Sequence, residues 1–198
     1  MNDRMILTTD RLTLREMTQA DLPALTQIMA DPITMTAYEG AFTDVEIQDW
    51  LDRQLQRYHE DGFGLWAVIL TSEDRMIGQC GLTRQQIGDA EVVEVGYLFN
   101  RAYWHHGYAI EAARACRDYA FTTLGVDEVY STVRVTNLAS MNVAIRNQMT
   151  IRTRYVKHYR GIDMPHYAFA VTRPWKHDLL NRAQVRPERV LQRFPRPT

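Results

Sequence analysis

A glycine at the start of a predicted helix marks the segment best suited to bind an anion. Residues 94–112 are predicted to form a strand, a short loop and a helix that begins at Gly107. The first N–H groups of a helix have no partner within it and lie at the positive end of its dipole, so a pyrophosphate is stabilised there. A tight turn that requires glycine for its backbone is the alternative explanation.

The residue types that bind metals are not arranged as a metal site. Cys80 and Cys116 are far apart in the sequence and form no metal-binding pair. His105 and His106 are adjacent, and no further ligand follows at helical or turn spacing. We therefore predict no metal site and expect both cysteines to be buried.

The segments around Gly107 are predicted to form a sheet. Three apolar runs separated by turn residues indicate an antiparallel meander, with strands at 65–71, 76–83 and 92–99. The helix after Gly107 carries a face of small residues, which allows close packing on a sheet. A strand at 129–135 and a helix from Asn137 to about 147 follow, which implies a crossover with parallel pairing.

Two helices are predicted before this meander. After a strand at 11–15, Thr18 precedes a helical stripe that ends at 31–32. Thr43 and Glu46 have the spacing of a capping box, so a second helix is expected to begin near Asp44. The loop at 32–41 joins the two helices.

The last regular segments read as a closing hairpin, with strands at 151–157 and 166–172 split by a turn at 161–165. From residue 174 onward Pro and Arg recur without periodicity. We predict one domain over 7–173 and a C-terminal extension over 174–198, because 198 residues suit a single buried core.

The composition is that of a globular protein, with 45% hydrophobic and 24% charged residues. Lys and Arg total 23 against 24 Asp and Glu, so no basic field indicates nucleic acid as a partner. The apolar runs are too short to span a membrane, and the first residues lack the pattern of a secretory signal. These features predict a cytoplasmic protein without a membrane partner.

The segment around Gly107 resembles the acetyl-CoA motif of the GNAT superfamily of N-acetyltransferases, Q/R-x-x-G-x-G/A after a strand. Gly107 and Ala109 match its last two fixed positions, and Trp104 replaces Gln or Arg. Trp at this position is similar to the RimJ/RimL-like branch, the ribosomal-protein N-terminal acetyltransferases. The opening TDRLTLREMTQADLPAL and the Asn137-x-x-Ser140 element are also similar to that branch.

The resemblance extends from Leu7 to about Thr172. It implies an α/β (α+β) fold: a mixed, mostly antiparallel central sheet of about seven strands, flanked by helices. Acetyl-CoA, the implied acyl donor, would lie where two central strands part. The implied cofactor-binding residues are Tyr97, Leu98, Phe99, Trp104, His105, His106, Gly107, Tyr108, Ala109, Ile110, Asn137, Ser140 and Arg146.

Proton transfer is assigned from the same resemblance. Glu94 is the preferred general base, because a partly desolvated carboxylate has a pKa raised toward neutrality; a plain charge at a strand edge is the alternative. Ser140 is the candidate acid for the departing thiolate, and a local backbone contact is its alternative. The tyrosine that some GNAT enzymes carry four residues later is Ala144 here.

The later helix ends differently from the family pattern Lys-x-Gly-Phe. Arg146 keeps the cation, but Gln148 stands where glycine is usual. Glycine adopts the left-handed conformation that commonly ends a helix, so Gln148 is expected to adopt a costly backbone conformation unless the cap differs.

The expected acceptor is a primary amine that attacks the thioester directly, and a protein N-terminal α-amine is preferred. A small amine such as an antibiotic or polyamine is the alternative. Tyr38 and Glu39 in the loop at 32–41 are expected to line the acceptor pocket, with a solvated loop as the alternative. Because Ala144 replaces a catalytic tyrosine, a non-catalytic acyl-CoA-binding module is a third possibility. Exposed sheet edges also suggest a homodimer.

Overall fold

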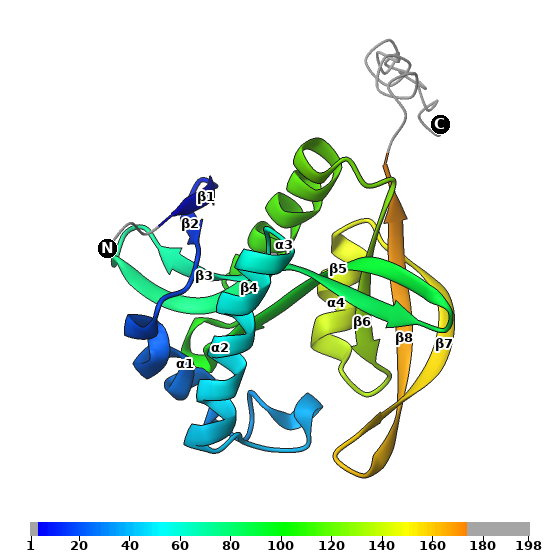
Figure 1. Ribbon diagram of the computed structural model, residues 1–198, viewed down its shortest axis with the longest axis horizontal. Helices are drawn as coiled ribbons and strands as arrows, with labels where there is room; N and C mark the ends of the chain where they lie inside the picture. Colours follow the sequence, from blue (N-terminus) through cyan, green and yellow to red (C-terminus); the bar gives the residue numbers. More distant parts are fainter. Residues whose placement is uncertain (1–3, 174–198) are drawn as a thin grey trace, which may run out of the picture.

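The structure, a computed structural model, describes residues 4–173, which form eight strands and four α-helices (Figure 1). The predicted extension at 174–198 lies outside this range. The strands are β1 (Met5–Thr8), β2 (Leu12–Arg15), β3 (Leu65–Leu70), β4 (Arg75–Ile87), β5 (Ala90–Phe99), β6 (Glu128–Arg134), β7 (Thr150–Tyr159) and β8 (Ile162–Thr172). The α-helices are α1 (Leu22–Met29), α2 (Asp44–Glu60), α3 (Tyr108–Tyr119) and α4 (Leu138–Arg146).

All eight strands belong to one sheet in the order β1-β2-β3-β4-β5-β6-β8-β7. Only the β5–β6 pair is parallel, and α3 lies in the crossover between these strands. The mixed, mostly antiparallel sheet is therefore confirmed. It has one strand more than expected, because β1 pairs with β2 at the sheet edge.

Local signals placed several boundaries correctly. The Thr43 hydroxyl accepts a hydrogen bond from the backbone N–H of Glu46, and the Glu46 carboxylate accepts one from the N–H of Thr43, so the capping box begins α2 as predicted. Asn137 caps α4 by accepting from the N–H of Ser140 at 3.0 Å. Cys80 and Cys116 are both free and fully buried, as expected.

The predicted turn at 161–165 is wrong. The β7–β8 hairpin turns at Arg160 and Gly161, and β8 runs through Pro165, which pairs with Val156. Proline cannot donate to a strand ladder, but the pairing of β8 with β6 reaches only as far as His166. On that side of the strand, therefore, Pro165 interrupts no ladder.

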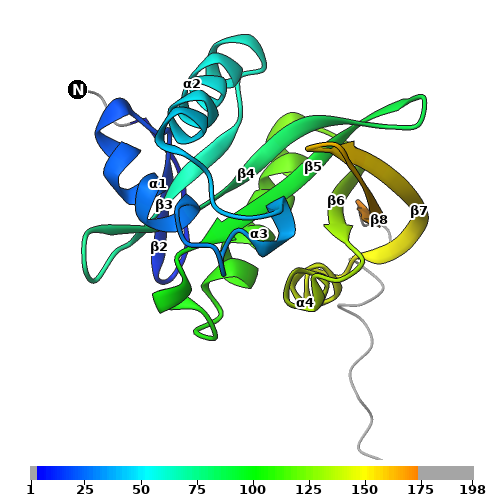
Figure 2. The same cartoon turned by 90° about the horizontal axis from the view of Figure 1, so that it is seen from below.

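Two apolar cores hold helices on opposite faces of the sheet (Figure 2). One core joins α1 and α2 to the face that carries Leu65, Ala67 and Ile69. The other joins α3 and α4 to the opposite face, with Trp66 and Val68 at its centre. Successive side chains of β3 thus point to opposite faces of the sheet and pack in different cores, as the two-residue period of a strand requires.

Gly81 allows the closest backbone approach in the central sheet. A Cβ atom at this position would lie 2.1 Å from the carbonyl oxygen of Gly64 and 2.8 Å from Cα of Leu65. Because backbone atoms cannot move aside as a side chain can, we expect Gly81→Ala to lower the free energy of unfolding by about 3 kcal/mol.

Urea unfolding of Gly81→Ala measures this loss, and Gly96→Ala is the matched control. A Cβ at Gly96 would meet only the mobile end of the Leu65 side chain, at 3.2 Å. Equal stability losses in the two variants would contradict the prediction.

Candidate active site

The backbone conformation of the loop before α3 exposes the N–H groups of the first helical turn. Gly107 is the N-cap of α3 with φ of 82°, and His105 is also left-handed with φ of 65°. The first helical hydrogen bond runs from the N–H of Glu111 to the carbonyl of Gly107. The N–H groups of Tyr108, Ala109 and Ile110 therefore precede the helical ladder and suit a phosphate.

A side chain from the turn between β1 and β2 holds this loop in place. Arg11 donates to the His106 carbonyl at 3.1 Å and through Nε to Glu111 Oε2 at 2.7 Å, and its guanidinium lies 4.5 Å from the centre of the Tyr108 ring. Burial alone would raise the pKa of Glu111, but hydrogen bonds from Thr9 and Arg11 outweigh it and lower the pKa. The Glu111 carboxylate in the first turn of α3 therefore stays charged, and its charge is balanced by Arg11.

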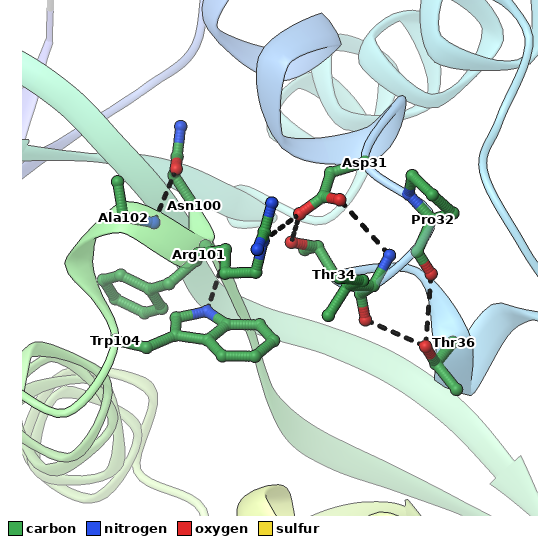
Figure 3. Close-up of polar contacts among 10 residues, drawn as sticks. Asp31, Pro32, Thr34, Thr36, Asn100, Arg101, Ala102 and Trp104 are labelled. Carbon is green, nitrogen blue, oxygen red and sulfur yellow. Dashed lines mark hydrogen bonds and ion pairs between the residues drawn. The ribbon is translucent and has the colours of Figure 1, made fainter.

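Trp104 braces the loop against the end of β5. Its indole Nε1 donates to the Phe99 carbonyl at 2.9 Å (Figure 3). In the same view, Arg101 donates to Asp31 at the end of α1, with a distance of 2.9 Å. The loop at 100–107 between β5 and α3, called the donor loop below, is thus tied to the end of β5. It is also tied to the start of the loop that precedes α2.

β5 and β6 are paired only at Glu94 and Tyr130 and then part. The Val95 carbonyl accepts a hydrogen bond from the Ser131 hydroxyl on β6, and the Phe99 carbonyl accepts from Trp104. Since neighbouring residues of a strand direct their backbone groups to opposite sides, Tyr97 presents its N–H and C=O to the gap. Leu98 instead directs its backbone groups to β4, where it pairs with Gln79.

The start of α4 lies at the same gap. The Tyr97 hydroxyl donates to the Ser140 carbonyl at 2.8 Å. Within residues 4–173 the Ser140 hydroxyl makes no hydrogen bond, so a local backbone contact does not occupy it. The structure therefore brings Tyr97, Asn137 and Ser140 together.

Arg146, at the other end of α4, shares a surface groove with the donor loop. The groove has a volume of about 570 Å³ and is lined on this side by His106, Gly107, Arg114 and Arg146. Arg146 is exposed, and its carbonyl accepts from Arg114 at 3.2 Å. The predicted cation and the predicted phosphate loop thus lie at one groove.

The end of α4 has the strained conformation expected from its sequence. Gln148 is left-handed with φ of 66°. Arg114 and Arg117 on α3 donate to the carbonyls of Arg146 and Asn147, which supplies partners to the last turn of α4. Ala144, where some GNAT enzymes carry a tyrosine, is fully buried on the inner face of α4.

We expect Gln148→Gly to raise the free energy of unfolding by about 0.5 kcal/mol, because relief of the left-handed strain exceeds the added freedom of the unfolded chain. For a chain of this size this corresponds to an increase in Tm of roughly 1–2 °C. Scanning calorimetry measures it, with Gln148→Ala, which keeps the backbone strain, as the control. A lower Tm for the glycine variant would contradict the prediction.

Glu94 lies where β5 and β6 meet, and it is held from β6. Its Oε1 accepts from the backbone N–H of Thr132 at 3.1 Å and from the Thr132 hydroxyl at 2.8 Å. Burial raises the pKa of Glu94, and the Thr132 hydrogen bonds together with Lys157 and Arg57 offset only part of this increase. A carboxylate with a raised pKa is suited to accept a proton near neutrality.

The loop between α1 and α2 brings Tyr38 to the same face. Burial raises the pKa of Tyr38, and the negative charge of Glu94 adds to this effect. The Tyr38 ring packs edge-on against Phe42 and Trp50, with centroid distances of 5.9 Å and 6.0 Å. Glu39 forms an ion pair with Arg134 on β6, so it closes the loop over the sheet.

The sequence did not indicate the polar side chains that β6, β7 and β8 place on the same face of the sheet as Glu94. They include Thr132, Arg134, Tyr155, Lys157 and His166. Burial lowers the pKa of His166, whose Nδ1 contacts the Met164 carbonyl at 2.8 Å. The alternation of Tyr130, Thr132 and Arg134 along one strand face was the available signal.

A family model described as the acetyltransferase (GNAT) domain matches residues 11–150. The chain belongs to the GNAT acetyltransferase family. GNAT enzymes use acetyl-CoA as the acyl donor, and this chain is an acetyl-CoA-dependent N-acetyltransferase. The gap beside Tyr97 and the open first turn of α3 are consistent with this donor.

Three relatives and solved structures resemble this chain over most of their length. The uncharacterized protein YkkB of Bacillus subtilis (strain 168) is 36% identical over 145 residues, which cover 73% of this chain and 84% of YkkB. The crystal structure of the acetyltransferase from Agrobacterium tumefaciens str. C58 is 30% identical, with a TM-score of 0.71 and coverage of 84% and 94%. RimL, a ribosomal L7/L12 alpha-N-protein acetyltransferase solved with coenzyme A, has a TM-score of 0.71 at 15% identity, covering 85% of this chain and 98% of its own.

In the described part of this GNAT chain, no group of three or more His, Cys, Asp or Glu side chains is arranged to hold a metal ion. Among residues 4–173 no helix has both the length and the apolar character needed to cross a membrane.

Proposed function

We propose that this GNAT enzyme transfers the acetyl group to a primary amine by direct attack on the thioester, with Glu94 as the proton acceptor. The position of Glu94 is the observation that carries the proposal. Its carboxylate lies at the junction from which β5 and β6 part, where the Tyr97 backbone faces the gap. A nucleophile between them contacts both the base and the acyl group.

The proposed step uses residues of this chain at each atom. The amine nitrogen forms a bond to the carbonyl carbon while the Tyr97 N–H donates to the developing oxyanion. Glu94 accepts the proton that the nitrogen loses. The carbon–sulfur bond then breaks, and the Ser140 hydroxyl, which makes no hydrogen bond within residues 4–173, assists by donating to the leaving thiolate.

We infer that the acceptor is a protein N-terminal α-amine. The ordinary pKa of an α-amine is about 7.7–8.0, against about 10.4 for a lysine-like amine, so a carboxylate deprotonates it more readily. Arg57 and Lys157 contribute positive charge at Glu94, which disfavours a polycationic acceptor such as a polyamine. Trp104 and Asn137-x-x-Ser140 support the RimJ/RimL-like branch, whereas the likeness to RimL itself concerns only the fold.

A small-molecule amine is the second candidate. FsC-acetyl coenzyme A-N(2)-transacetylase of Aspergillus fumigatus is 26% identical over 152 residues, which cover 70% of this chain and 63% of that protein. The loop over the site also favours a slim acceptor, because Glu39–Arg134 holds the loop to β6 and Arg160–Glu46 holds the start of α2, directly after the loop, to the β7–β8 turn. Both a chain terminus and a small amine satisfy this restriction.

Thiol release from acetyl-CoA with a panel of acceptors tests the proposal. The panel contains a peptide with a free N-terminus, the same peptide with the N-terminus blocked and an internal lysine, spermidine, and small α-amino amides. We expect turnover with the free peptide and little with the blocked peptide or spermidine. Turnover with the small amines alone would contradict a protein N-terminus as the acceptor and support a small-molecule amine.

Cytoplasmic location and a homodimer stay predictions. Among the described strands, β1 and β7 lie at the ends of the sheet and each has only one neighbour, which leaves edges available for association.

A further inference from the structure

Thr132 makes two hydrogen bonds to one carboxylate oxygen of Glu94, the proposed base. Its backbone N–H and its hydroxyl both donate to Glu94 Oε1, at 3.1 Å and 2.8 Å. Within residues 4–173, Glu94 Oε2 accepts no hydrogen bond. Two donors on one oxygen fix the plane of the carboxylate and leave the other oxygen open.

Thr132 directs its hydroxyl to a single acceptor. Within residues 4–173, its hydrogen-bond partner is Glu94 Oε1. Thr132 pairs with Ala168 on β8, and Tyr155 on β7 pairs with His166, two residues before Ala168, so the Thr132 and Tyr155 side chains lie on the same side of the sheet.

We propose that Thr132 is a positioning residue that holds Glu94 Oε1 so that Oε2 faces the acceptor amine. The inference rests on the proposed function, in which Glu94 is the base. A hydrogen bond to the charged form of a carboxyl stabilises that form. Thr132 therefore also sets the pH above which Glu94 is ready to accept a proton.

The other groups around Glu94 come from several elements and remain in a Thr132 variant. Arg57 lies on α2, Lys157 and Tyr155 on β7, Tyr97 on β5 and Tyr38 in the loop before α2. The cations favour the charged form of Glu94 and the buried surroundings oppose it. A change confined to Thr132 thus isolates its own contribution.

The test compares Thr132→Val and Thr132→Ser in the full-length enzyme. Valine keeps the shape and the backbone bond but removes the hydroxyl, and serine keeps the hydroxyl. We expect Thr132→Val to shift the acid limb of the pH profile of kcat/KM upward by about one pH unit and to lower kcat about tenfold. Thr132→Ser should keep both close to the wild-type values.

Thr83→Val is the matched control. Thr83 lies directly opposite Glu94 on β4, but its hydroxyl accepts from Gln85 and makes no bond to Glu94. The same Thr-to-Val change there should leave the acid limb in place. A Thr83 variant that shifts the profile as much as Thr132→Val would overturn the proposal.

An NMR titration of the Glu94 carboxyl carbon separates this inference from the proposed function, because it reports proton binding without turnover. A titration midpoint that rises in Thr132→Val together with the acid limb supports the proposal. An unchanged midpoint overturns it while leaving Glu94 as the base. A raised midpoint with an unchanged pH–rate profile means that Glu94 is not the base, which removes both the proposed function and the positioning role.

Discussion

Glu94→Gln is expected to lower kcat by about 100-fold or more, because the amide has the shape of the carboxylate but cannot accept the proton of the amine. The loss should be greatest above the pKa of Glu94, where the wild-type carboxylate is charged and active. The wild-type rate falls as pH falls through that pKa, and the variant should lack this acid limb.

The same substitution should not destabilise the protein. Burial raises the pKa of folded Glu94 above its ordinary value of 4.5, so the folded state binds the proton more tightly than the unfolded chain does. The stability that a raised pKa contributes is present below the unfolded value and is lost as pH rises through the folded value. At neutral pH the charged carboxylate therefore costs stability, and the neutral amide removes that cost.

Steady-state kinetics against pH, together with thermal unfolding, measure both effects. Glu91→Gln is the control, since Glu91 lies on the same strand but its side chain is 59% exposed and pairs with Arg84. A Glu94→Gln enzyme that keeps the wild-type pH profile would remove Glu94 from the mechanism.

Gly107→Trp is expected to weaken acetyl-CoA binding on the order of 100-fold, about 3 kcal/mol, since several N–H bonds to phosphate would be lost together. An indole at the N-cap of α3 occupies the space in front of the first helical turn. The fold should persist, because a Cβ at Gly107 meets only Arg11 Nη2, at 3.6 Å. The left-handed φ of 82° adds a strain of about 1–2 kcal/mol.

Titration calorimetry with acetyl-CoA measures the affinity, and circular dichroism checks the fold. Gly107→Ala is the control: it carries the same backbone strain but little bulk, so its affinity should remain within a few-fold of the wild type. If Gly107→Trp binds acetyl-CoA as tightly as the wild type, the phosphates of acetyl-CoA do not bind at the first turn of α3.

The sequence predicted those features that depend on neighbouring residues. The capping box at Thr43, the Asn137 cap and the left-handed Gln148 follow from backbone groups within a few positions of each residue. The helix start at Gly107 belongs to the same class. Such features need no knowledge of the tertiary structure.

Contacts between distant segments escaped the sequence analysis. Nothing near Arg11 in the chain indicates that it holds the carbonyl of His106, 95 positions away. Thr132 was read as part of a strand, and only the pairing of β5 with β6 brings it to Glu94. The predicted turn at Pro165 failed for the same reason, because the extent of the β6–β8 ladder decides whether proline interrupts it.

The Arg11 contacts connect the folding of the N-terminal strands to the donor site. Arg11 and Glu111 are 100 positions apart, so their pairing closes a long loop and costs chain entropy. Partly folded states in which β1 and β2 are detached lack the support of the donor loop. A donor that binds only the supported loop therefore favours the docked strands by mass action. Binding of acetyl-CoA is therefore expected to stabilise the attachment of β1 and β2 to the rest of the sheet.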